Sequence, residues 1–281
     1  MGRSGTSAIT RVLSLCGGSL PKYLLTPNAG NPTGYWEPLD GLHLNEAFLQ
    51  RRGSNWYDPR PAVQVLSTID SREGDVFVDE ITTFLQDYVE RPLLLIKEPR
   101  ITALTAFWFA AACRLGFQIL VVVAVRHPAE VAGSLAARDA VPIELSNTLW
   151  LKYNGLAEQR SRQVPRVFVE YPNLLNDWKK EINRIACALK IELHSTQSAE
   201  IETFLSPDLR HQRVSVEDDV HENPTAVHRI YTSMSMAARD VAFSGLEVEG
   251  LIDAHMASVE AETAFQQFTT RYAPGLSRPF A

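Results

Sequence analysis

The chain has 281 residues, of which 45% are hydrophobic and 21% are charged, so it is long enough for one large α/β domain with a buried core. Its formal net charge of -6 argues against nucleic acid or an anionic membrane as a partner, although a local cluster of arginines and backbone N–H groups can still bind an anion. The longest wholly apolar run, Ile119–Val125, is too short to span a bilayer. We therefore expect a soluble, cytoplasmic protein without a transmembrane segment; a homo-oligomer is compatible with this composition.

Three cysteines, Cys16, Cys113 and Cys187, stand alone in apolar helical patterns. They have neither disulfide nor CxxC spacing, so we expect them to be reduced residues of the core. The histidines are scattered without the spacing of metal ligands, and no metal site is expected.

The chain opens with a glycine- and hydroxyl-rich loop, Gly2–Ser7, which leads into a helical pattern that ends near Gly17. Such a loop offers an anion free N–H groups and the positive end of a helix dipole. Arg3 adds a fixed charge, and Thr6 and Ser7 add hydroxyl groups. The alternative is an ordinary helix that is capped by Ser4 behind an N-terminal tail. The loop has neither the length nor the lysine of a Walker A sequence, which disfavours an enzyme that hydrolyses nucleoside triphosphates.

The next region, residues 17–70, is rich in proline, glycine and asparagine and contains Trp36 and Trp56. Irregular segments of this kind in α/β proteins usually carry binding function. Glu37 lies in this region just before a helical pattern at Leu39–Gln50, where it could cap the helix N-terminus.

Beyond this region, apolar runs alternate with helical patterns. The expected strands are Leu93–Lys97, Phe117–Arg126 and Val167–Tyr171. The expected helices are Thr102–Leu115, Pro128–Arg138, Ile143–Arg162 and Asn173–Lys190. This alternation predicts a three-layer α/β fold, a parallel sheet with helices on both faces. We expect one domain over residues 1–281, in which residues 206–281 form a mostly helical extension with helices at Val227–Phe243 and Leu251–Phe268.

The second expected strand ends at Arg126, and Ser134 lies two turns into the helix that Pro128 begins. An arginine and a hydroxyl group suit a phosphate, because both donate hydrogen bonds to its oxygens. Each residue alone has an ordinary alternative: a strand-end arginine paired with a carboxylate, and a neutral helical serine.

Two of these segments resemble the PAPS-dependent sulfotransferases, which use 3′-phosphoadenosine-5′-phosphosulfate (PAPS). Arg3-Ser4-Gly5-Thr6-Ser7 resembles their 5′-phosphosulfate loop, and the R-x-P-x-x-V-x-x-S pattern from Arg126 to Ser134 resembles their 3′-phosphate element. The resemblance implies a P-loop NTPase-like sulfotransferase fold of the bacterial type, with 3′-phosphoadenosine-5′-phosphate (PAP) as product and no metal. Family members have a hydrophobic strand before the loop. Here we expect either that the sequence as read starts after that strand or that the sheet lacks its first strand.

Two further segments resemble elements of the same family. Lys97-Glu98-Pro99-Arg100 resembles a K-D-P-R segment, in which Lys97 would neutralise charge on the sulfuryl group or the leaving phosphate; the alternative is a structural cluster of ion pairs. The segment 206–213 resembles a late basic element, in which Arg210 and Arg213 would close over the nucleotide; the alternative is a solvated basic cluster.

The family uses a histidine or a glutamate as the general base. The resemblance favours Glu37 here, and His43 is the alternative. The expected reaction moves a sulfuryl group from PAPS to a hydroxyl of a carbohydrate, glycolipid or other small molecule. Two alternatives stay open: a nucleotide-binding paralogue with impaired catalysis, and an atypical P-loop kinase.

Overall fold

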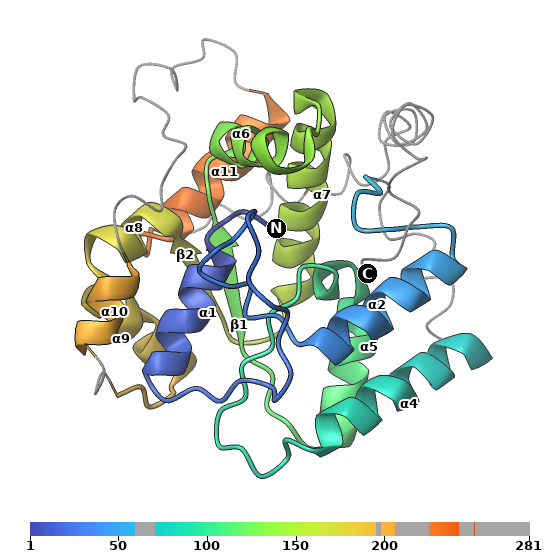
Figure 1. Cartoon of the computed structure of the whole chain (residues 1–281). Helices are drawn as coiled ribbons and strands as arrows, with labels where there is room; N and C mark the ends of the chain where they lie inside the picture. Colours follow the sequence, from blue (N-terminus) through green and yellow to red (C-terminus); the bar gives the residue numbers. More distant parts are fainter. Residues whose placement is uncertain (60–70, 195–197, 206–224, 242–249, 251–281) are drawn as a thin grey trace.

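The computed structural model describes residues 1–59, 71–194, 198–205, 225–241 and 250 (Figure 1). Within these ranges it has ten helices and two strands. In chain order the helices are α1 (Thr6–Leu15), α2 (Leu39–Arg51), α4 (Arg72–Gln86), α5 (Ile101–Arg114), α6 (Pro128–Asp139), α7 (Ile143–Ser161), α8 (Tyr171–Asn176), α9 (Trp178–Leu189), α10 (Ser198–Phe204) and α11 (Ala226–Ala237). None of the described helices is long and apolar enough to cross a membrane.

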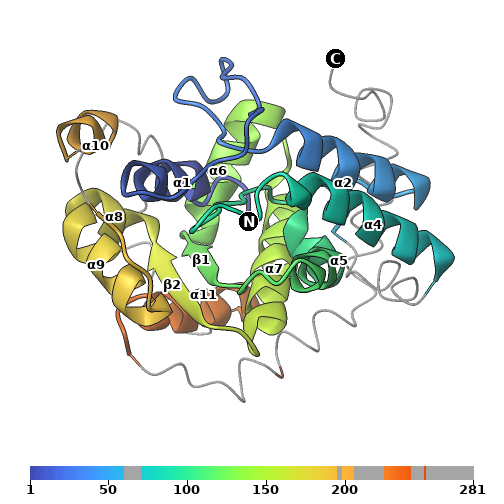
Figure 2. The same ribbon diagram turned by 90° about the horizontal axis from the view of Figure 1, so that it is seen from below.

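The two strands lie side by side at the centre of the molecule. β1 (Val121–Val125) pairs in parallel with β2 (Arg166–Glu170), from Val121 opposite Arg166 to Val125 opposite Glu170. Figure 2 shows α1 on one side of this pair and α11 on the other. Because successive side chains of a strand point to opposite faces, β1 contributes Val123 to the core shared with α7 and α11, and Ala124 to the core shared with α1 and α9. The expected parallel pairing and its coverage by helices on both faces are thus present.

The first expected strand, Leu93–Lys97, is wrong in its extent. This segment forms only an isolated parallel bridge, in which the Ser19 N–H donates to the Leu93 carbonyl at 2.8 Å and the Leu95 N–H donates to the Ser19 carbonyl at 2.8 Å. A cavity of about 490 Å³, lined by this segment and by Val121–Ala124, separates it from β1. Since no described segment fills that space, neither edge has a partner there, and the described sheet has two strands instead of three.

Most expected helices are confirmed to within a few residues of their ends, with two corrections. The single helix expected at Asn173–Lys190 is two helices, α8 and α9, because Asp177 leaves the helical conformation (φ −152°, ψ 81°) and its carboxylate caps α9 at the Lys180 N–H, 3.0 Å away. Helix α4 was not expected from the sequence. It begins where the Ser71 hydroxyl accepts a hydrogen bond from the Gly74 N–H at 3.1 Å.

Two more expectations need comment. All three cysteines are free, but only Cys16 is buried; Cys113 and Cys187 are exposed at the ends of α5 and α9, so they are not core residues. In the C-terminal extension, α11 confirms the start of the helix expected at Val227–Phe243 but ends at Ala237. The helix expected at Leu251–Phe268 lies outside the described residues.

A separate aromatic core joins α2, α4 and α5. The rings of Phe48 and Phe77 stack with centroids 4.1 Å apart, and Phe107 meets both edge-on at 5.1 and 5.3 Å. All three side chains are fully buried. This cluster fixes α5, whose N-terminal end follows the segment 97–100.

We expect Phe107→Ala to lower the free energy of unfolding by about 3–5 kcal/mol, because it leaves a cavity among the three rings. The control is Phe109→Ala on the same helix. Phe109 is only partly buried and lines the central cavity, so its loss should cost under about 2 kcal/mol. Urea denaturation of both variants measures the difference; equal losses would contradict this description of the two environments.

Candidate functional site

The loop before α1 is held in a conformation that depends on glycine. Gly5 is the N-cap of α1 with φ +80°, and a Cβ atom there would lie 2.3 Å from the Tyr171 ring. Arg3 also has a positive φ, 66°. No side chain caps α1, so the N–H groups of its first turn keep their capacity to bind an anion. Ser4 is fully buried, and its hydroxyl has no hydrogen-bond partner among the described residues. Ser4 therefore does not cap the helix, and the alternative interpretation of this loop is wrong.

The structure brings the loop and the end of β1 into direct contact. The Arg3 Nε donates to the Ser134 hydroxyl at 2.8 Å, across 131 positions of sequence, and the Arg126 Nη1 donates to the Arg3 carbonyl at 3.0 Å. Arg126 also forms a buried ion pair with Glu130, with Nε 2.8 Å from Oε2, and the Trp150 indole fixes its backbone carbonyl at 3.0 Å. The two segments in which the sequence predicted anion binding thus lie in direct contact.

Lys97 contacts the same loop at Ser7. Its Nζ lies 3.3 Å from the Ser7 hydroxyl, 3.0 Å from the Tyr35 carbonyl and 2.5 Å from Oε1 of Glu37. Both side chains of the Lys97–Glu37 pair are largely buried, with exposures of 12% and 8%. Helix α2 begins after Pro38 without a side-chain cap, so Glu37 serves as the partner of Lys97 and not as a helix cap.

A turn over the start of α1 positions Glu37. The Trp36 ring lies under the Arg11 guanidinium at 4.5 Å from the ring centroid, and the Asn31 amide donates to the Gly34 carbonyl at 2.7 Å. Trp36 has φ 57°, in the left-handed region, so packing against α1 holds this backbone in place. One face of Trp36 is consequently covered by Arg11.

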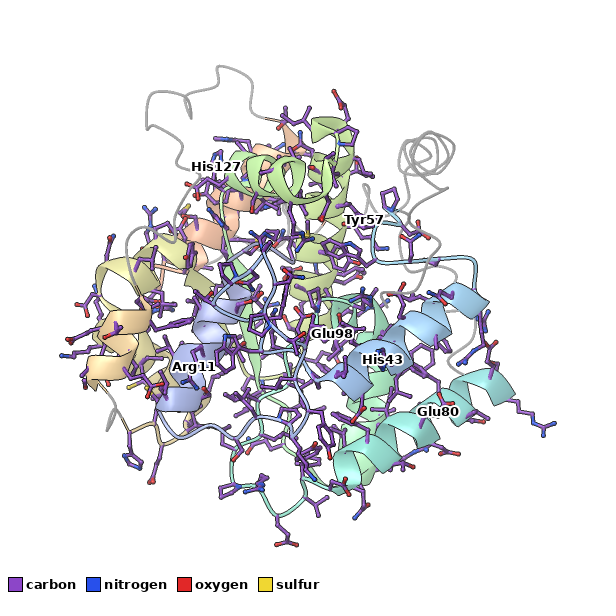
Figure 3. All side chains as sticks on the ribbon, viewed as in Figure 1. Arg11, His43, Tyr57, Glu80, Glu98 and His127 are labelled. Carbon is purple, nitrogen blue, oxygen red and sulfur yellow. The ribbon has the colours of Figure 1, made fainter. Side chains whose placement is uncertain are left out.

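Behind Lys97 lies a buried network that the sequence analysis offered only as an alternative. Arg100 donates to Glu98 at 2.6 Å and to Glu46 at 2.5 Å, and Asn45 donates to Glu98 at 2.6 Å and accepts from Trp108 at 2.8 Å. Burial raises the pKa of Glu98. Glu98, labelled near the centre of the view in Figure 3, is buried. The segment 97–100 therefore divides: Glu98 and Arg100 anchor it, and Lys97 faces the loop.

The site is electropositive although the chain is acidic. Burial, and then the nearby Arg138 and Arg126, lower the pKa of the Arg3 guanidinium. Burial, and then Lys97, lower the pKa of the Met1 amine to about 5. Among the described residues, Arg3 has no carboxylate within ion-pairing distance. A bound anion would offset this excess of positive charge.

Sequence reasoning missed Arg138. It lies four residues after Ser134 on α6, so both side chains reach the same side of the helix, and this spacing was visible in the sequence.

The two candidate bases lie in different places. His43 is exposed in the middle of α2, away from the loop contacts. It is Glu37 that contacts Lys97. Arg210 and Arg213 lie outside the described residues.

No protein family, curated protein or solved structure matches the chain.

Gly5→Ala tests the loop geometry. A left-handed alanine costs about 1–2 kcal/mol, and here its Cβ would also meet the Tyr171 ring. Gly17→Ala is the matched control, because Gly17 has φ +109° but open space around it. We expect Gly5→Ala to lower the melting temperature more than Gly17→Ala does, and we expect loss of anion binding in Gly5→Ala alone. Equal effects of the two changes would contradict the close fit at Gly5.

Proposed function

We propose that the protein is a sulfotransferase that moves a sulfuryl group from PAPS to a hydroxyl group of a carbohydrate, glycolipid or other small molecule. One observation carries the proposal: Arg3, Ser134 and Arg126 lie in hydrogen-bond contact although they come from the two segments that resemble the 5′- and 3′-phosphate elements of that family. A nucleotide with phosphates at both ends of its ribose needs two such elements near each other.

The residues divide between the two ends of the nucleotide. The N–H groups after Gly5 and the hydroxyls of Thr6 and Ser7 suit the 5′-phosphosulfate at the start of α1. Arg126 and Ser134 suit the 3′-phosphate, and Arg3 lies between the two groups, bonded to Ser134. The additional phosphate is what distinguishes PAPS from ATP.

The chemistry would fall to Lys97 and Glu37. In sulfuryl transfer, the acceptor oxygen bonds to sulfur while the bond between sulfur and the phosphate oxygen breaks, and the acceptor proton must leave. The Glu37 carboxylate, beside the start of α1, can take that proton. The Lys97 ammonium contacts the Ser7 hydroxyl of the loop and can stabilise the negative charge on the leaving phosphate.

Glu37→Gln should lower turnover by about 10²-fold or more, because the amide cannot accept the proton, while PAP still binds. Transfer of radiolabelled sulfate from PAPS to acceptors in a cell extract measures turnover. Asp40→Asn, an exposed change in the first turn of α2, is the control and should leave transfer unchanged. Normal transfer by Glu37→Gln would exclude Glu37 as the base. PAP binding by the unaltered protein without transfer to any acceptor would favour the nucleotide-binding alternative.

Loss of Arg126 should weaken PAP binding by about 2–3 kcal/mol, the contribution of a charged hydrogen bond. Because its removal would leave the Glu130 carboxylate buried without its partner, we compare Arg126→Gln/Glu130→Gln with Glu130→Gln alone. Titration calorimetry with PAP and with ATP gives both affinities. Equal PAP affinity in the two variants would contradict the proposed role of Arg126. Tighter binding of ATP than of PAP by the unaltered protein would contradict the proposed function and favour a kinase.

A further inference from the structure

The end of α6 carries a cation that the proposed function does not use. Glu130, Ser134 and Arg138 follow one another at intervals of four along this helix. The first pairs with Arg126 and the second accepts from Arg3, so this side of α6 meets the loop. Arg138 extends the same row by one turn.

Arg138 and Arg3 both reach Gly30. The Arg3 Nη1 donates to the Gly30 carbonyl at 3.3 Å, and a Cβ atom on Gly30 would lie 3.1 Å from Cδ of Arg138. Apart from burial, Arg138 is the strongest of the influences that lower the pKa of Arg3. The two guanidinium groups therefore repel each other across a glycine that leaves room between them.

Asp139 holds Arg138 in the structure. Its Oδ2 lies 2.7 Å from Nε and 2.5 Å from Nη2 of Arg138. Burial lowers the pKa of Arg138, but the Asp139 carboxylate and Tyr57 outweigh burial and raise this pKa above its ordinary value. Adjacent side chains within a helix do not face each other. Asp139 is the last residue of α6, which ends at Ala140 with φ 53°, and its carboxylate contacts the Arg138 guanidinium there. Asp139 thus supplies a negative charge that is local to the last turn.

The three cations that have carboxylate partners differ in how easily they can exchange them. The partners of Arg126 and Lys97 are buried, with exposures of 1% for Glu130 and 8% for Glu37. Asp139 is 22% exposed, as is Arg138. Water can solvate the Asp139 carboxylate when it leaves Arg138, so this pair separates at the least cost.

We infer that Arg138 is a further anion-binding residue of the site, and that Asp139 is an internal counter-ion which a bound phosphate displaces. The inference rests on the proposed function for the identity of the ligand, a nucleotide that carries two phosphate groups and about 3–4 negative charges. Arg3, Arg126, Arg138 and Lys97 supply four positive charges around it, two of which the buried carboxylates of Glu130 and Glu37 offset. The buried Ser4 hydroxyl, which has no partner among the described residues, lies in the same loop.

A double-mutant cycle tests the inference with PAP as the probe in titration calorimetry. Arg138→Gln should weaken binding by about tenfold or more. Asp139→Asn should strengthen binding by about threefold or more, because the phosphate no longer competes with a carboxylate. In the Arg138→Gln background, Asp139→Asn should have no effect. Arg138→Lys keeps the charge without the planar fork, and its melting temperature should match that of the unaltered protein. A loss of PAP affinity in this variant then does not come from misfolding.

The exposed pair Arg114–Asp79 is the control, because its atoms lie 2.7 Å apart on α5 and α4 and its neutralisation changes the net charge equally. Arg114→Gln and Asp79→Asn should leave PAP affinity unchanged. The inference is overturned if Asp139→Asn has no effect alone or the same effect in both backgrounds.

Inorganic tripolyphosphate as a second probe separates this inference from the proposed function. If tripolyphosphate shows the coupled effects and PAP does not bind, the proposed function fails and the anion-binding role of Arg138 stands. If PAP binds without coupling between the two positions, the role of Arg138 fails alone. Binding of neither probe by the unaltered protein overturns both.

Discussion

The contact between the N-terminal loop and α6 is the constraint on which the site depends. The loop contributes backbone N–H groups, and the Arg3–Ser134 and Arg126–Arg3 hydrogen bonds tie it to α6 and to the end of β1. Gly5 makes that approach feasible, because the Tyr171 ring occupies the space that any Cβ atom would need. β1 in turn is set by β2 and by the Trp150 indole, which holds the Arg126 carbonyl.

Most of the cations around this contact are paired with carboxylates. The chain is acidic overall, but Arg126, Lys97 and Arg138 each pair with a carboxylate, and the Arg3 side chain donates to the Ser134 hydroxyl and the Gly30 carbonyl. Burial of these cations costs desolvation free energy, and the carboxylates offset most of that cost without neutralising the whole site. The remaining positive charge is local, so the net charge of -6 gives no guide to the ligand.

Sequence patterns predicted those elements whose structure depends mainly on neighbouring residues. Pro128 and the apolar run before Arg126 located β1 and α6, and with them two site residues. Leu93–Lys97 is as apolar as a strand, but a strand also needs a partner, and pairing is a property of distant segments that this sequence pattern does not contain. The Lys97–Glu37 pair and the separation of Lys97 from Glu98 likewise depend on contacts 60 and 53 positions away in sequence, with Glu37 and Asn45. Helix α4 was missed although Ser71 and its apolar spacing were visible.

The positions of the two phosphate groups can be seen in a crystal structure with bound 3′-phosphoadenosine-5′-phosphate. We expect density for the 5′-phosphate at the start of α1, within hydrogen-bond distance of the N–H groups after Gly5. Density for the 3′-phosphate should lie beside Arg126 and Ser134. A nucleotide bound elsewhere, or one whose two phosphates both avoid the loop and α6, would contradict this expectation.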